Sequence, residues 1–179
     1  MHPVGVRVGG FYQLPTPAQV AALLPRLEAA LAEARELVAW TAGLPLPDDS
    51  QDFVSVALRA ADGYAINHGR LVSDRGLDGA VADWEQHFRE FHVPHSTALH
   101  AELDGAPYLV GPLARLNLNR DRLPAEVAAS LAATGLRLPS TNMFHSVVAR
   151  AVEIQLVLHQ ALALLRDYRP PARPAEPWR

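Results

Sequence analysis

The strongest constraint on the fold is a long apolar pattern in the last quarter of the sequence. Apolar residues recur there at the three- and four-residue spacing of one helix face. We expect a helix that is capped by Ser140, Thr141 or Asn142 and runs to about Tyr168. Its apolar stripe consists of Val147, Val148, Ala151, Ile154, Leu158 and Leu165.

A second long helix is predicted near the N-terminus. Thr16 and Pro17 are residue types suited to an N-cap and a first helical position, and Gly43 is suited to end a helix. The apolar stripe continues to Trp40, but Pro25 interrupts it. Either a short helix precedes a second one at this proline, or one helix kinks there.

The segments between these helices predict shorter elements. Phe53 to Leu58 alternates like a strand, and Asp104-Gly105 has the two-residue form of a hairpin turn. Further predicted elements are an extended segment over 1–14, hairpin strands over 98–103 and 108–118, an amphipathic helix over 80–91 and a short helix over 123–135. The predicted fold class is α+β and helix-dominated, with long helices and small antiparallel sheet elements.

The domain prediction is a single domain over residues 1–168, followed by a tail over 169–179. The length of 179 residues is sufficient for one domain with a sizeable core. The tail is rich in proline, so we expect it to be extended and weakly ordered.

Composition excludes some classes of function. The formal net charge is −3, whereas nucleic-acid-binding proteins usually carry a basic surface. No run of 18 uncharged apolar residues occurs, and the first residues lack the pattern of a signal peptide. We therefore expect no nucleic-acid partner and no membrane span, and a cytoplasmic location is compatible with this composition.

The sequence contains no cysteine. This excludes disulfides, thiolate nucleophiles, and zinc or iron–sulfur sites with cysteine ligands. It is compatible with a reducing compartment.

Histidines offer the one alternative set of metal ligands. His87, His92, His95 and His100 lie close together in the sequence, and His92 and His95 have a spacing found in metal sites. The low-ranked candidate ligands are His92, His95 and His100. The opposing interpretation is that these are surface or hydrogen-bonding histidines, because their spacing matches no zinc signature and Pro94 breaks any helix that would align them.

Two further pairs of residues have a structural interpretation. Gly9-Gly10 matches no phosphate-binding motif and instead predicts a close approach of backbone to another segment. Arg150 and Glu153 lie three residues apart, so they can pair on one face of the last helix. Their spacing fits a partly buried pair and a solvated pair equally well.

Five segments together resemble the large subunits of cytoplasmic, cofactor-coupled nickel–iron hydrogenases. They follow the order of that family and cover nearly the whole chain. The most specific is YLVGPLARLNLN at 108–119, which resembles the family pattern YLVGPLAR-(V/L)-NLN. The others are HPVGVRVGG at 2–10, NHGRLVS at 67–73 with GLD at 76–78, VPHSTALH at 93–100 and FHSVVARAVE at 144–153.

The departures from this family concern its metal centre. The family holds nickel and iron with the thiolates of an R-x-C-G-x-C and a D-P-C-x-x-C motif, and neither occurs here. The resemblance therefore implies no catalytic residue, metal ligand or cofactor in this chain, while the intact family has a nickel–iron centre. It implies scaffold or interface roles for Gly9, Gly10, Arg115, Asn117, Asn119, Arg150 and Glu153, with Arg115 to Asn119 on a predicted strand.

Three hypotheses follow. The favoured one is a fragment or remnant of a large subunit, from a truncated or split gene, which is inactive alone although the family oxidises hydrogen reversibly. Its expected partners are a small iron–sulfur subunit and polypeptides that carry the missing cysteine motifs. The second is a non-catalytic scaffold that assembles with other hydrogenase subunits. The third is a small hydrolase or metal-binding protein that uses the His87 to His100 cluster.

Overall fold

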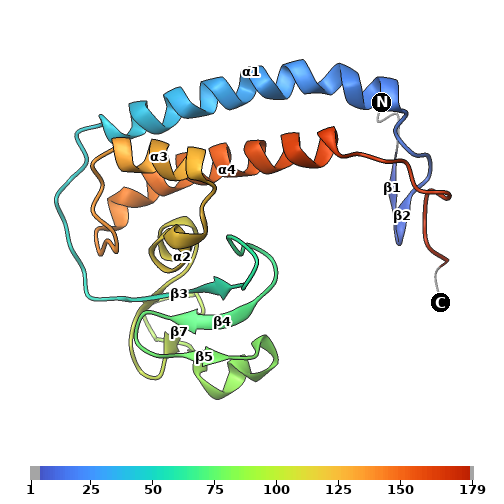
Figure 1. Ribbon diagram of the computed structural model, residues 1–179. Helices are drawn as coiled ribbons and strands as arrows, with labels where there is room; N and C mark the ends of the chain where they lie inside the picture. Colours follow the sequence, from blue (N-terminus) through green and yellow to red (C-terminus); the bar gives the residue numbers. More distant parts are fainter. Residues whose placement is uncertain (1–4, 178–179) are drawn as a thin grey trace. The chain divides into compact units, whose positions relative to one another are not determined.

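The two long predicted helices are present in the computed structural model, which describes residues 5–177 (Figure 1). The helices are α1 Pro17–Ala42, α2 Pro112–Asn119, α3 Ala125–Ala133 and α4 Ser146–Arg166, with 3-10 helices η1 Val81–Gln86, η2 Arg120–Arg122 and η3 Met143–His145. The strands are β1 Val6–Arg7, β2 Gly10–Phe11, β3 Val54–Arg59, β4 Arg70–Ser73, β5 Asp78–Gly79, β6 Phe88–Phe91, β7 His100–Leu103 and β8 Tyr108–Leu109. The α+β, helix-dominated prediction is confirmed.

Helix α1 begins where the sequence predicts. The backbone N–H of Gln19 donates to Thr16 Oγ1 over 3.2 Å, and the N–H of Thr16 donates to Gln19 Oε1 over 2.8 Å. This reciprocal pair is a capping box, and Pro17 takes the first helical position, where no donor is needed. The helix continues through Pro25 and ends at Ala42, one residue before Gly43. It is therefore not broken at the proline.

The largest sheet has the strand order β5-β4-β3-β8. Strands β3, β4 and β5 pair antiparallel, whereas β8 pairs parallel with β3 at Val54 and Ser55. The turn at Asp104-Gly105 is present, since both residues have positive φ and Leu103 and Ala106 exchange backbone hydrogen bonds. It does not join two long strands, because β7 pairs with β6 and the chain after Leu109 turns into α2.

The amphipathic helix predicted over 80–91 is wrong. The segment forms the 3-10 helix η1 and then strand β6, which pairs antiparallel with β7 from Phe88 opposite Leu103 to Phe91 opposite His100. Trp84, Phe88 and Phe91 fit a helical spacing, but Phe88-Arg89-Glu90-Phe91 can equally be extended. Pairing with β7 decided between these two conformations.

The contacts divide the chain into two compact units, where one domain over 1–168 was expected. Residues 1–34 with 157–179 form the first, and residues 35–156 form the second. In the first unit Arg166 pairs with Glu28 and the Tyr168 hydroxyl donates to the carbonyl of Pro15. The last residues of the described tail pair with the β1–β2 hairpin through a bridge between Gly10 and Ala175.

The second unit contains two groups of buried apolar side chains. Helix α2 lies between the four-stranded sheet and α3 (Figure 1). The larger group joins α2, α3 and the start of α4, and is centred on Leu113, Leu116, Val127, Val152 and Leu156. The smaller group lies on the sheet around Val54, Val56 and Leu103. Helix α2 is thus the central element of this unit.

One helical stretch, Met143–Arg166, is long and apolar enough to cross a bilayer by its length and composition. Of its most apolar window, 44% is buried inside the protein. The core helix of a soluble protein meets the same criterion.

Candidate functional site

The most specific sequence motif, residues 108–119, folds as strand β8 followed by helix α2. The strand predicted over Arg115–Asn119 is therefore wrong. The Leu-Asn-Leu-Asn alternation resembles a strand, but Pro112 starts a helix and fixes the first φ angle. Leu113 and Leu116 then both enter the core, at a spacing of one helical turn.

Asn117, on the sheet side of α2, connects three segments of the second unit. Its amide nitrogen donates to the Ser55 hydroxyl over 3.0 Å and to the Ser140 carbonyl over 2.9 Å. Its amide oxygen accepts from the Ser140 backbone N–H over 2.8 Å. All three residues are buried, so an apolar replacement of Asn117 would leave several buried polar groups unpaired.

Asn119 forms a hydrogen bond to the part of β3 that does not pair with β8. Its amide nitrogen donates to the carbonyl of Leu58 over 3.0 Å and to that of Arg115 over 3.1 Å. Its amide oxygen is buried and has no partner among the described residues. The side chain therefore holds α2 against β3 where no strand pairs.

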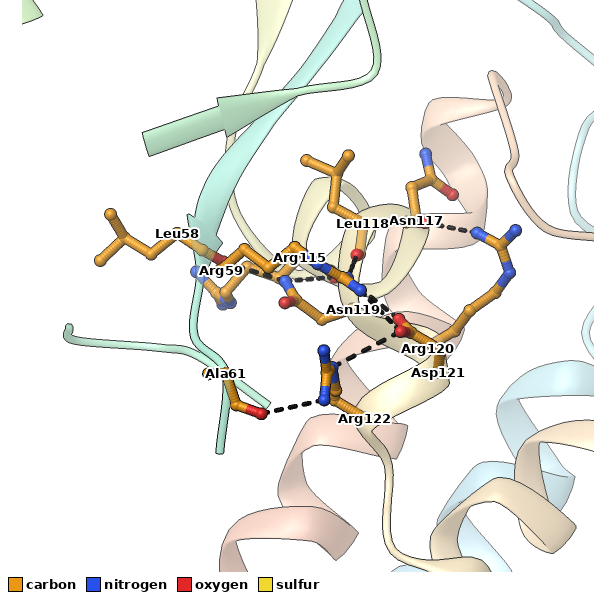
Figure 2. A network of polar contacts seen from close by, with 10 residues as sticks. All are labelled: Leu58, Arg59, Ala61, Arg115, Asn117, Leu118, Asn119, Arg120, Asp121 and Arg122. Atoms are coloured by element: carbon orange, nitrogen blue, oxygen red, sulfur yellow. Dashed lines mark hydrogen bonds and ion pairs between the residues drawn. The ribbon is translucent and has the colours of Figure 1, made fainter. Parts of the chain in front are cut away.

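A second polar group closes the C-terminal end of α2 (Figure 2). The guanidinium of Arg59 forms a two-point ion pair with Asp121, over 3.0 and 2.6 Å, and also donates to the carbonyl of Leu118. Arg120 donates to the carbonyl of Asn117. The last carbonyls of a helix have no partner within it, and here arginine side chains supply the donors.

The ion pair with Arg59 also affects the protonation of Asp121. Chiefly through this hydrogen bond, the pKa of the Asp121 carboxyl is lowered from its ordinary value. Arg122 adds a contact to the same group by donating to the carbonyl of Ala61 over 2.9 Å. The group joins the end of β3 to the end of α2.

A third, largely buried network joins α2 to α4. Arg115 donates to both carboxylate oxygens of Glu153, each over 2.7 Å, and the Tyr64 hydroxyl donates to one of them over 2.8 Å. The side chains of Arg115 and Glu153 are 23% and 11% exposed. Burial, reinforced by the Glu153 carboxylate, raises the pKa of the Tyr64 phenol well above its ordinary value.

The pair expected between Arg150 and Glu153 does not form. Glu153 is buried and binds Arg115, whereas Arg150 is exposed and forms no hydrogen bond or ion pair with the described residues. The two positions differ by three residues, but Glu153 is turned toward α2. A two-point contact with the partly buried guanidinium of Arg115 is more favourable than a solvated contact along the helix.

Gly9 and Gly10 lie in the first unit, where they contact the C-terminal tail. The Phe11 N–H donates to the Pro174 carbonyl over 2.8 Å, and the Glu176 N–H donates to the Gly9 carbonyl over 2.9 Å. A Cβ atom on Gly10, whose φ is +149°, would lie 2.5 Å from the Pro174 carbonyl oxygen. Gly10 thus permits the close approach of backbone to backbone. His2, Pro3 and Val4 of the same motif lie outside the described residues.

The histidines do not converge on one point. His95 and His100 approach with ring centroids 6.3 Å apart, while His87 is 3.6 Å from Asp104. In residues 5–177 no three histidine, aspartate or glutamate side chains are placed to hold a metal ion. The candidates His92, His95 and His100 are therefore not assembled into a metal site.

The nickel–iron centre of the resembling family does not fit this chain. That centre needs thiolate ligands, and the sequence has none. Around α2, the charged groups of Arg59, Arg115, Arg120, Asp121 and Glu153 are engaged with one another or with backbone carbonyls. Their arrangement is suited to fixing α2 in place rather than to binding a substrate.

A cavity of about 410 Å³ in the second unit is lined by Thr134, Arg137 and His145 among mostly apolar residues. His145 Nδ1 lies 2.7 Å from the Ser140 hydroxyl, which also accepts from the Asn142 N–H. The hydroxyl is buried and held by these contacts, so the pair lacks an accessible nucleophile.

Sequence reasoning missed several members of these networks. Tyr64, Arg59 and Asp121 lie in segments without a motif or a periodic pattern, and their partners are 62 to 89 residues away. No local signal identifies them. Arg115, Asn117 and Asn119 were found through the resemblance alone, whereas Glu153 was also singled out by its spacing to Arg150.

The comparisons with known proteins agree on one group of relatives. No protein-family model matches the chain. The chain is 28% identical over 173 residues to sulfhydrogenase 1 subunit alpha of Pyrococcus furiosus, covering 93% of this chain and 40% of that protein. It is 22% identical over 167 residues to sulfhydrogenase 2 subunit alpha of the same organism, covering 93% of this chain and 38% of that protein.

A solved structure shares the fold. The chain resembles the crystal structure of an NAD+-reducing nickel–iron hydrogenase in the H2-reduced state, with a TM-score of 0.68 and 25% identity. The match covers 89% of this chain and 40% of that chain. The resemblance to part of a hydrogenase large, or alpha, subunit is therefore confirmed. The chain spans about 40% of the length of the relatives it matches.

Proposed function

We propose that this chain is the scaffold portion of a nickel–iron hydrogenase large subunit and that the metal-binding thiolates come from other segments. Those segments belong either to the same longer polypeptide or to separate ones. The observation that carries the proposal is the match of 93% of the chain to 40% of a sulfhydrogenase alpha subunit, combined with the absence of cysteine.

The role of a scaffold is to hold elements in fixed positions. The structure has two features suited to it: the buried network of Tyr64, Arg115 and Glu153, and the asparagine contacts that fix α2 against β3. Polar networks whose members are paired make a core rigid and specific. In this proposal α2 is the fixed element against which the metal-bearing segments assemble.

The proposal includes the finer expectations from the family. The reaction is reversible hydrogen oxidation, the location is cytoplasmic, and the protein is soluble. The partners are a small iron–sulfur subunit and segments carrying R-x-C-G-x-C and D-P-C-x-x-C. When bound by those segments, the nickel–iron centre supplies the hydrogen chemistry, and this chain contributes no ligand to it.

The test is co-expression of the full chain with the unmatched N- and C-terminal portions of the Pyrococcus furiosus sulfhydrogenase 1 alpha subunit. Affinity capture on the chain should retain both portions and stoichiometric nickel, and hydrogen-dependent dye reduction should appear. The chain alone should retain no nickel and reduce no dye. Nickel retained by the chain alone, or a folded chain that captures neither portion, would refute the proposal.

A further inference from the structure

The cavity of about 410 Å³ described above lies within the second unit, and three segments of that unit line it. One follows α1, one connects α3 to α4, and one spans η3 and the start of α4. We call it the Arg137 cavity. Its volume is within the range of pockets that hold small organic molecules. The larger apolar side chains of its lining are Leu44, Leu46, Leu136 and Val148.

The Arg137 cavity contains a positive charge without a counter-ion. Arg137 is exposed and forms no hydrogen bond or ion pair with other residues of 5–177. Among the described residues that line the cavity, none is an aspartate or a glutamate. Enclosing an unpaired guanidinium under an apolar ligand would be costly, so the charge favours a ligand that carries an anionic group.

His145 supplies a second donor, which is held in place from one side of its ring. Nδ1 lies 2.7 Å from the Ser140 hydroxyl, which accepts from the Asn142 N–H over 3.2 Å. The hydroxyl keeps its own hydrogen to donate to Nδ1, so Nε2 carries the hydrogen of the neutral imidazole. Asn117 in turn binds the backbone N–H and carbonyl of Ser140. The Nε2–H donor is therefore oriented before any ligand arrives.

A neighbouring cavity of similar size lacks this feature. Its volume is about 400 Å³, and it shares Ala42 and Thr134 with the Arg137 cavity. Its arginine, Arg35, forms an ion pair with Glu126. The charge of Arg35 is thus balanced inside the second unit, whereas that of Arg137 is not. The demand for an anion is specific to the Arg137 cavity.

We propose that the Arg137 cavity binds a small carboxylic acid with an apolar chain, in its ionised form. The guanidinium of Arg137 and the Nε2–H of His145 donate to the carboxylate, and the chain lies against the apolar lining. A planar guanidinium matches a carboxylate through two parallel hydrogen bonds. Removal of the chain from water adds to binding. This ligand site is independent of the proposed scaffold role.

The experiment is a titration of the full, nitrogen-15-labelled chain with hexanoate, followed through amide chemical shifts. The signals of Leu136, Arg137 and His145 should shift and saturate. Hexan-1-ol and hexylammonium carry the same chain with a neutral or a positive head group. Each should bind at least about tenfold more weakly, because the charge-assisted hydrogen bonds are lost. Inorganic phosphate supplies an anion without the chain and should also bind more weakly than hexanoate.

Substitutions locate the binding site. Arg137→Gln should raise the Kd for hexanoate about tenfold or more, and Arg137→Lys should raise it less, since lysine keeps the charge. His145→Phe keeps an aromatic ring but removes the donor, and should raise the Kd severalfold. The matched control is Arg150→Gln, because Arg150 is also exposed and unpaired within residues 5–177 but does not line the cavity. Its Kd should be unchanged. Circular dichroism checks that each variant is folded.

The inference is overturned if hexanoate causes no saturable shifts, or if hexanoate and hexan-1-ol bind equally well. Unchanged affinity in folded Arg137→Gln and His145→Phe would also overturn it. A last arm adds the unmatched portions of the sulfhydrogenase 1 alpha subunit. If the captured portions displace hexanoate, the cavity is a contact for another polypeptide, which refutes the free-acid site and supports the proposed function. If hexanoate binds but neither portion is captured, only the proposed function fails.

Discussion

Removal of the Arg115 guanidinium should be among the most destabilising polar substitutions in the second unit. Arg115→Met keeps much of the aliphatic stem but, among residues 5–177, leaves the Glu153 carboxylate with only the Tyr64 hydroxyl as a side-chain partner. Breaking a buried ion pair from one side costs about 3–5 kcal/mol, since the remaining charge is desolvated and unpaired. The side chain of Arg115 is 23% exposed, so we expect the lower end, about 3 kcal/mol.

The assay is thermal unfolding at neutral pH, followed by circular dichroism. For a chain of this size about 1 kcal/mol shifts the Tm by roughly 2–4 °C, so Arg115→Met should lower it by about 6–12 °C. The matched control is Arg70→Met, because Arg70 and Asp78 form a surface pair with side chains 62% and 63% exposed. Such pairs contribute about 0–1 kcal/mol.

The double variant Arg115→Met with Glu153→Met separates the effect of losing the ion pair from the effect of leaving the Glu153 carboxylate unpaired. It should recover at least half of the decrease in Tm caused by Arg115→Met, because two apolar side chains replace the pair and no unpaired carboxylate remains. The reasoning is refuted if Arg115→Met is no more destabilising than Arg70→Met. It is also refuted if the double variant is as unstable as the sum of the two single ones.

Three further substitutions test the other contacts. Because the pKa of Tyr64 is raised, the folded state keeps the phenol protonated while the unfolded state ionises near pH 10. The contribution of this group to stability is therefore full below pH 10 and falls above it. In urea unfolding from pH 8 to 11, the free energy of unfolding should decline less in Tyr64→Phe than in the unsubstituted chain. Because the pKa of Asp121 is lowered from its ordinary value of 3.8, its ionised carboxylate stabilises the folded state above pH 3.8. This contribution to stability is lost as the pH falls below that value. Asp121→Asn should therefore flatten the acid limb of the unfolding curve, and an unchanged limb would show that the Arg59 pair contributes nothing there. Gly10→Val should increase proteolysis of the C-terminal tail, because its Cβ would displace the tail backbone, whereas Gly79→Ala, with open space around its Cβ, should not.

Local patterns were sufficient for the elements that depend on one short stretch of chain. Thr16, Pro17 and Gln19 define the start of α1 through a capping box, and the apolar periodicity predicted α4 to within a few residues of its ends. The alternation over Phe53 to Leu58 predicted β3. These signals work because capping and amphipathicity are determined by neighbours three or four residues apart.

Patterns compatible with two conformations gave wrong predictions. The residues of 116–119 alternate as a strand would, and those of 80–91 repeat as a helix would. In the first case Pro112 and the core contacts of Leu113 and Leu116 selected a helix, and in the second the pairing of β6 with β7 selected a strand. Packing against distant segments overrides a weak local preference.

What the sequence by itself determined is therefore the class of fold, the main helices and the absence of thiolate ligands, since zero cysteines is a chemical fact independent of folding. Only the tertiary structure decided the polar contacts. Spacing offered Arg150 as the partner of Glu153, yet Glu153 pairs with Arg115, which lies 38 residues away. A buried carboxylate takes the donor that the fold brings to it with the best geometry, and neither burial nor geometry is encoded in the distance along the chain.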